Sequence, residues 1–109
     1  MSYYITSKGK KVDIDSSKTE LYLNRKDIVE LNVSDCINLE KLDYSNNKLT
    51  KLDLSKCIKL THLYCTNNQL TQLDTRKNIK LEYLDCDIKT NIVNINQYIN
   101  NKKVEINQI

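Results

Sequence analysis

Four cysteines have the greatest potential for chemistry, and they occur in two pairs with the same spacing. The interval from Cys36 to Cys57 equals the interval from Cys65 to Cys86. Thiols can bind zinc, form disulfides or act as nucleophiles. A zinc site normally needs close pairs such as Cys-x-x-Cys, which the sequence lacks. Neighbouring coils would bring paired cysteines within disulfide range, but in-register parallel side chains suit the disulfide dihedral poorly. We therefore predict two short ladders of buried, free thiols that pack as small apolar side chains.

Carboxylates are the next candidates for chemistry. Asp43 and Asp85 are separated by twice the cysteine interval. If each interval is one coil of a stack, the two acids lie ~9.6 Å apart. That distance is near the upper limit of the separation between the two catalytic carboxyl groups of inverting glycosidases. We expect no catalysis, because a flat, open sheet leaves both acids in water and no loop is long enough to close a pocket.

Other catalytic or cofactor-binding motifs are missing from the sequence. There is no phosphate-binding glycine loop, no nucleophile motif and no Cys–His pairing in a plausible context. Asp53 and Asp74 belong to a repeated Leu-Asp turn pattern, where they are expected to bind local backbone amides. We therefore predict that the protein is not an enzyme and needs neither a cofactor nor a metal.

The cysteine interval extends through most of the chain. Residues 39–59 read LEKLDYSNNKLTKLDLSKCIK, and residues 60–80 read LTHLYCTNNQLTQLDTRKNIK. These two copies share most of their apolar positions. A more divergent copy starts at Leu81, and another with the same spacing starts at Lys18. Such self-similarity predicts a stack of structural repeats.

The pattern LxxLxCxxNxLxxLDLxxCxx resembles the leucine-rich-repeat superfamily, in particular its 21-residue class, called IRREKO. The class is common in bacterial proteins and in some viral and protist proteins. The resemblance covers residues 18 to about 95. It implies a right-handed coil with a parallel strand in each repeat, and it does not imply a ligand. The residues that carry it are Leu42, Tyr44, Asn47, Leu49, Leu52, Asp53 and Leu54, then Leu63, Cys65, Asn68, Leu70, Leu73 and Asp74.

Elementary geometry leads to the same fold. Leu42 and Tyr44 alternate with Asp43 along an extended segment, so they share one of its faces. Leu49 must then point back inside, so the chain turns twice in each repeat. Stacked coils cover one another's apolar stripes, which no single repeat could do. We therefore predict a β-rich repeat solenoid, in which Asn47 and Asn68 lie inside turns and satisfy backbone groups of their own and the next coil.

The repeats form one domain with a cap at each end. Residues 1–17 are predicted to be a capping hairpin, with strands at Tyr3–Thr6 and Val12–Ile14. Residues 18–95 hold four repeats, at 18–38, 39–59, 60–80 and, in degenerate form, 81 to about 101.

The period is lost after Cys86, so the last copy differs from the inner ones. Lys26 and Lys89 replace the turn asparagine in the outer copies, as capping repeats often do. Residues 96–109 are predicted to form a C-terminal cap. Its edge strand, Lys103–Ile106, carries charge that discourages further stacking.

Charge and hydropathy exclude several classes of partner. The net charge of +3 is spread along the chain and does not form the dense basic stripe of a nucleic-acid-binding protein. Neither a signal peptide nor a membrane span is visible. We expect a soluble protein of the reducing cytoplasm, or of the host cytoplasm if it is viral or an effector. Abundant Asn, Ile and Lys indicate an A/T-rich genome, of bacterial or viral origin.

The outward side chains of the strands are the best candidates for a binding surface. Tyrosine suits an interface, because it offers a large contact area at a small entropic cost and keeps a polar tip. His62 is expected to be solvated, and the opposite face, with Lys51 and Lys77, is expected to be a solvated back. The predicted partner-binding residues are Tyr22, Asp43, His62, Tyr64, Tyr83 and Asp85.

We therefore predict a non-catalytic module for protein–protein interaction that binds through its strand face. The expected partner is a protein, with neither nucleic acid nor membrane involved, and the chain is expected to be a monomer or a weak homodimer. One alternative is a carbohydrate or small-ligand binder that uses Tyr22, Tyr64 and Tyr83 as stacking platforms. Others are a host-directed effector and a purely structural repeat protein.

Overall fold

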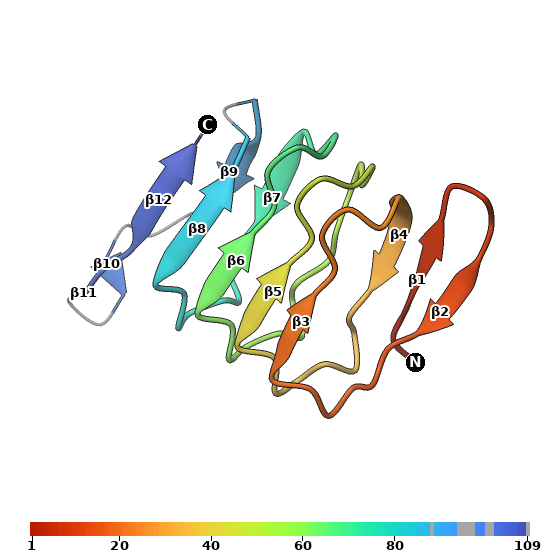
Figure 1. Ribbon diagram of the computed structural model, residues 1–109. Helices are drawn as coiled ribbons and strands as arrows, with labels where there is room; N and C mark the ends of the chain where they lie inside the picture. Colours follow the sequence, from red (N-terminus) through yellow and green to blue (C-terminus); the bar gives the residue numbers. More distant parts are fainter. Residues whose placement is uncertain (88, 94–97, 100–101, 109) are drawn as a thin grey trace.

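Five parallel strands form the front sheet of the computed structural model, which describes residues 1–87, 89–93, 98–99 and 102–108 (Figure 1). Leu21, Leu42, Leu63 and Leu84 lie side by side in register, one per coil, and all four are buried. The predicted solenoid of parallel strands is confirmed. In sheet order the strands are β12 (Glu105–Gln108), β8 (Tyr83–Cys86), β6 (His62–Tyr64), β5 (Lys41–Asp43) and β3 (Glu20–Tyr22).

The back layer is discontinuous. β4 (Ile28–Asn32) pairs with a hairpin of β1 (Tyr3–Thr6) and β2 (Lys11–Asp13), all antiparallel. β7 (Gln72–Asp74) pairs only with β9 (Asn91–Val93). Between these two sheets, residues 50–54 of the second coil form no strand. The back layer therefore consists of two separate sheets, whereas the front sheet is continuous (Figure 1).

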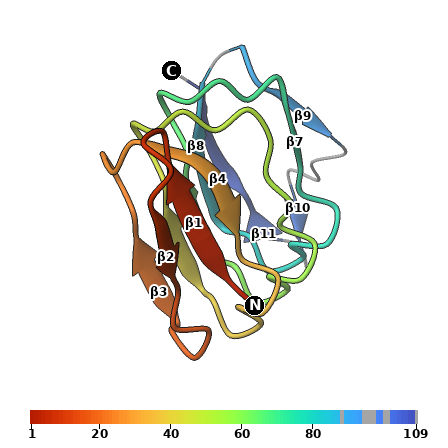
Figure 2. The ribbon, with the colours of Figure 1, turned by 90° about the vertical axis from the view of Figure 1, so that its right-hand side faces the viewer.

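The N-terminal hairpin lies at the end of the solenoid and extends the back layer (Figure 2). Its second strand is one residue earlier than the predicted Val12–Ile14. Val12 pairs with Tyr4, and the Ile14 amide still donates to the Ser2 carbonyl at 3.0 Å. Hydrogen bonding thus continues past the strand end, so the two boundaries describe nearly the same segment.

The C-terminal edge strand is also shifted, and here the prediction of Lys103–Ile106 was wrong. Residues 102–103 form β11, which pairs with β10 (Tyr98–Ile99). The edge strand β12 instead centres on Ile106, which lies beside Leu84 and packs against the core. Ile106 comes one residue later than the repeat interval from Leu84 would place it, so the last coil is longer than the inner ones. The rest of the predicted cap, 96–109, lies partly outside the described residues.

The core fills the space between the two layers. It consists mainly of leucines, and all four cysteines lie in it as free thiols with at most 1% exposure, as predicted. The molecule measures 43 × 30 × 17 Å, so it has room for only one apolar layer. Within the described residues there is no helix, and hence none that could cross a membrane.

Paired asparagines build the turn after each inner strand. Asn46 and Asn67 adopt left-handed backbone angles, with φ of 58° and 56°, which asparagine tolerates better than most residues. The Asn47 side chain donates to the carbonyls of Leu23 and Tyr44, both at 2.8 Å. Its partners therefore lie in its own coil and the preceding coil, so the predicted bond to the next coil was wrong.

The turn aspartates behave as predicted. Asp53 accepts a hydrogen bond from the Ser55 amide at 2.9 Å, and Asp74 accepts one from the Arg76 amide at 3.0 Å. The pKa of both carboxyl groups is held below the ordinary range. The main causes are side-chain hydrogen bonds from Ser55 and Arg76, and the backbone bonds add to them. Both aspartates are structural parts of the turns.

Candidate functional site: the strand face

The strand face is the outward surface of β3, β5, β6, β8 and β12, and its residues lie in two rows across the coils. Strand alternation places each row beside the buried leucines. Because the strands are in parallel register, neighbouring residues in a row come from successive coils. The first row is Glu20, Lys41, His62, Tyr83 and Glu105, and the second is Tyr22, Asp43, Tyr64, Asp85 and Asn107.

Three aromatic side chains of this face form a compact cluster. The ring centroids of Tyr64 and Tyr83 are 5.4 Å apart, and the His62 ring lies 6.1 Å from Tyr83 and 6.5 Å from Tyr64. Such separations are typical of favourable aromatic pairs. All three side chains are half-buried, and burial raises the pKa of Tyr64. His62 is therefore only partly solvated, and its Nδ1 also lies 2.9 Å from the Thr61 hydroxyl.

Tyr22 does not join the cluster. It is 54% exposed and donates a hydrogen bond from its hydroxyl to Glu20 at 2.5 Å. This bond raises the pKa of Tyr22. Asp43 lies between Tyr22 and Tyr64 in the register, so the third predicted tyrosine stands apart from the other two.

Two half-buried carboxylates flank Tyr64 in the second row. Asp43 accepts hydrogen bonds from the amide and the hydroxyl of Ser45, at 3.0 and 2.6 Å. Asp85 interacts with the Asn107 side chain, but its Oδ1 atom is buried and has no hydrogen-bond partner within the described part of the chain. Burial raises the pKa of Asp85, so its negative charge is poorly solvated. A cationic group placed here would relieve this unfavourable burial.

The strand face as a whole is acidic. Its single lysine, Lys41, is outnumbered by the carboxylates, although the chain carries a net charge of +3. The positive charge must therefore lie elsewhere. The predicted back residues Lys51 and Lys77 are exposed, as are Lys56, Gln72 and Arg76. The carboxylates of the face are Glu20, Asp43, Asp85 and Glu105, with Asp87 following β8.

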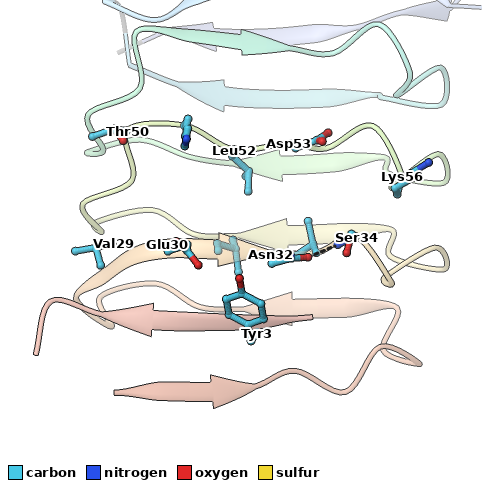
Figure 3. Close-up of a pocket in the computed structure, with 12 residues that line it drawn as sticks. Tyr3, Val29, Glu30, Asn32, Ser34, Thr50, Leu52, Asp53 and Lys56 are labelled. Atoms are coloured by element: carbon cyan, nitrogen blue, oxygen red, sulfur yellow. Dashed lines mark hydrogen bonds between the residues drawn. The ribbon is translucent and has the colours of Figure 1, made fainter. Parts of the chain in front are cut away.

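The back also has a cleft, which the sequence analysis missed. Its volume is about 600 Å³, and it lies between β4 and residues 50–53 of the second coil (Figure 3). Leu52 points into it and is only half-buried, whereas its repeat equivalents Leu31 and Leu73 are buried. Residues 50–53 make no backbone hydrogen bond to β4 or β7 within the described structure. The identical spacing of the three leucines gives no sign of this difference.

Two of the four cysteines, Cys57 and Cys65, are poorly suited to nucleophilic chemistry, whereas the bond from Cys65 lowers the pKa of Cys86. Burial raises the pKa of the Cys57 thiol to about 12, and contact with Cys86 together with burial raises that of Cys65. Both thiols therefore stay protonated at neutral pH and are weak nucleophiles. Among the described residues, no group of three or more His, Cys, Asp or Glu side chains is arranged to hold a metal ion.

Comparison with known proteins identifies the repeats. A family model described as leucine-rich repeats (two copies) matches residues 37–78. The functional domain of InlJ from Listeria monocytogenes, described as including a cysteine ladder, is similar in structure, with a TM-score of 0.68 and 34% sequence identity. The match covers 74% of this chain but only 18% of that chain. No curated protein sequence matches.

Both comparisons agree with the repeat fold of the chain. Leucine-rich-repeat folds are common scaffolds for protein–protein interaction and are typically non-catalytic. The buried leucines of successive coils, stacked in parallel strands, are the family's defining feature in this structure. The chain therefore has the leucine-rich-repeat fold, and residues 37–78 match the leucine-rich-repeat family.

Proposed function

We propose that the strand face binds a protein partner, with the cluster of His62, Tyr64 and Tyr83 as its anchor. The observation that carries this proposal is the packing of three rings on an open, outward sheet surface. These rings are already partly ordered by one another, so a partner loses little additional side-chain entropy when it covers them. Half-buried aromatic side chains with polar tips are also typical of the energetic centres of interfaces.

The acidic surroundings of the cluster favour a basic partner. Asp43 and Asp85 flank Tyr64, so two carboxylates lie beside the rings of the cluster. An arginine or lysine of the partner could lie against the rings and bond to these carboxylates. Complementary charge of this kind accelerates association and selects the partner, and its effect weakens with added salt.

The size of the face limits the affinity. Five strands at ~4.8 Å, each with about five residues at ~3.3 Å, cover only ~400 Å² of flat surface. A standard interface takes ~800 Å² from each partner. The partner must therefore contact the turns at the strand ends as well, or bind only weakly.

A matched pair of double variants tests this proposal. Partners captured from a lysate of the source cell or its host are identified, and their affinities are measured with the purified protein. Tyr64→Ala with Tyr83→Ala should weaken binding at least about thirtyfold, since loss of an interface anchor costs ~2 kcal/mol or more. Circular dichroism of the same variant checks that the fold is retained.

The control is Lys51→Ala with Lys77→Ala, which removes two exposed side chains from the back. This variant should change the affinity only modestly. If the lysine variant abolishes binding and the tyrosine variant does not, the partner binds the back and the proposal is wrong. A captured glycan or small ligand that depends on the tyrosines would instead support the carbohydrate alternative.

A further inference from the structure

Three isoleucines form an exposed row along one edge of the solenoid. Ile37, Ile58 and Ile79 are 55%, 51% and 60% exposed, although isoleucine is normally buried. They are spaced at the repeat interval and occupy the same place in successive coils. We call this row the isoleucine ridge. It accounts for three of the six large apolar side chains that are exposed in the described structure.

Backbone hydrogen bonds fix the ridge. Each isoleucine lies in a tight turn that leads from the back layer into the front sheet (Figure 1). The amide of Leu60 donates to the carbonyl of Cys57 at 3.2 Å, and the amide of Leu81 donates to the carbonyl of Asn78 at 3.1 Å. The first coil has the same bond, from Leu39 to Cys36 at 3.2 Å. The repeated turn therefore points all three isoleucines outward from one edge.

Lysines flank the ridge in two of the three coils. The second coil reads Lys-Cys-Ile-Lys at residues 56–59, and the third reads Lys-Asn-Ile-Lys at residues 77–80. All four lysines are exposed, and none is in an ion pair with a described residue. Lys59 donates a hydrogen bond to the Asn38 side-chain oxygen at 3.0 Å, in the adjacent coil.

The aspartates on the back side of the ridge are already engaged. Asp35, which replaces the first lysine in the outer coil, pairs with the terminal amine of Met1 at 2.7 Å. Asp74 pairs with Arg76 at 2.6 Å, and Asp53 is bonded to Ser55. None of these aspartates forms an ion pair with a ridge lysine in the described structure, although Asp53 and Asp74 lie near enough to Lys56 and Lys77 for their charges to interact.

We propose that the isoleucine ridge docks on an anionic membrane surface, which departs from the expectation from the sequence that no membrane is involved. Apolar side chains on turn tips insert into the boundary between headgroups and acyl chains, and lysines beside them bind anionic headgroups. Each element is weak alone, and stable attachment of a peripheral protein needs two such signals together. The ridge supplies both in one line of turns.

The shape of the ridge favours a lipid surface over a protein partner. Three side chains at the coil spacing of ~4.8 Å form a row only ~10 Å long. Such a narrow row covers far less area than the ~800 Å² that each partner contributes to a standard protein interface. A fluid bilayer conforms to a narrow ridge and needs no matching shape. The ridge also lies on turns outside the strand face, so this proposal does not depend on the proposed protein partner.

Vesicle sedimentation with the purified protein tests the proposal. The wild-type chain should sediment with phosphatidylcholine vesicles that contain about 30% phosphatidylserine, and should remain in solution with phosphatidylcholine alone. Replacing Ile37, Ile58 and Ile79 together with serine should weaken binding at least about tenfold, because the apolar contact is lost. These side chains are exposed, so the far-ultraviolet circular dichroism should stay unchanged.

A charge-matched pair of variants separates the ridge from net charge. Gln in place of Lys56, Lys59, Lys77 and Lys80 should weaken binding at least about a hundredfold, since each lysine near such a surface contributes about fivefold. Gln in place of Lys8, Lys10, Lys26 and Lys51 gives the same net charge, +3 less 4 or −1, and should cost far less. Equal losses in the two variants would overturn the proposal. The proposal would also be overturned if the isoleucine variant bound vesicles as well as the wild-type chain, or if the wild-type chain did not sediment with anionic vesicles.

Discussion

Asn47 shows how a single side chain joins two coils. Its Oδ1 atom accepts from the amides of Lys26 and Ile28, at 3.1 and 2.9 Å. Its amide group donates to Leu23 and Tyr44, on either side of the coil boundary. The residue is 7% exposed, so water cannot replace these bonds.

Asn47→Ala should therefore be strongly destabilising. The variant leaves the buried backbone groups of Ile28 and Leu23 without partners, and each such group costs ~1–3 kcal/mol. We expect the free energy of unfolding, measured in urea, to fall by ~2–4 kcal/mol. Asn24→Ala is the control, because Asn24 is exposed, and it should change the free energy by less than about 0.5 kcal/mol. Comparable losses in both variants would contradict this role.

The sequence predicts which face a residue occupies better than what it contacts. Periodicity correctly placed Tyr64, Tyr83 and His62 on the outward side of the strands. It could not show that their rings pack together while Tyr22 bonds to Glu20, because side-chain torsions depend on neighbours from other coils. For the same reason, the free oxygen of Asp85 became visible only in the structure.

At the scale of elements, the front strands were predictable and the back was not. Front strands pair at each coil, so a repeated sequence gives a repeated structure. In the back, Leu31 lies in β4 and Leu73 in β7, and each of these strands pairs with a neighbour on one side only. Leu52 has the same spacing, but its segment pairs with neither. Its burial therefore depends on the distance to adjacent coils, which the repeat pattern does not specify.

Two leucine substitutions within successive coils measure this difference. Leu63 is fully buried in the front sheet, so Leu63→Ala should cost ~3–5 kcal/mol of unfolding free energy. Leu52→Ala should cost less than about half of that, because Leu52 already borders the open cleft. Urea denaturation of both variants checks the prediction. If Leu52→Ala is as costly as Leu63→Ala, the cleft is closed in solution.

At the scale of the whole molecule, the number of coils followed from the sequence, but the path of the last one did not. The pairing of Gln72 with Asn91 spans slightly less than one repeat, and the pairing of Tyr83 with Glu105 spans slightly more. The chain therefore shortens one turn and lengthens another while the strands stay in register. The sequence showed where the period is lost, after Cys86. It did not show that a shorter back turn and a longer front turn would together keep the strands in register.

Hydrogen exchange should reveal the difference between front and back across the molecule. The amides of Tyr44 and Cys65 donate to carbonyls of the next coil, at 2.9 and 2.8 Å, so they should exchange slowly. The amides of Lys51 and Leu52 have no backbone acceptor in the described structure and should exchange at least about a hundredfold faster. Exchange followed by NMR gives residue-level rates. Uniform protection along the second coil would contradict the observed gap in the back layer.

The gap between β4 and β7 gives the solenoid a preferred direction of bending. The front sheet resists stretching along the stacking axis, because each coil is hydrogen-bonded to the next. The back of the second coil has no such bonds along residues 50–53, so the separation of its neighbours can change without breaking any there. The curvature of the strand face can therefore adapt around β5 and β6, beside the aromatic cluster. A partner of the kind proposed for the strand face that is slightly too convex or too flat would be accommodated by bending rather than by unfolding.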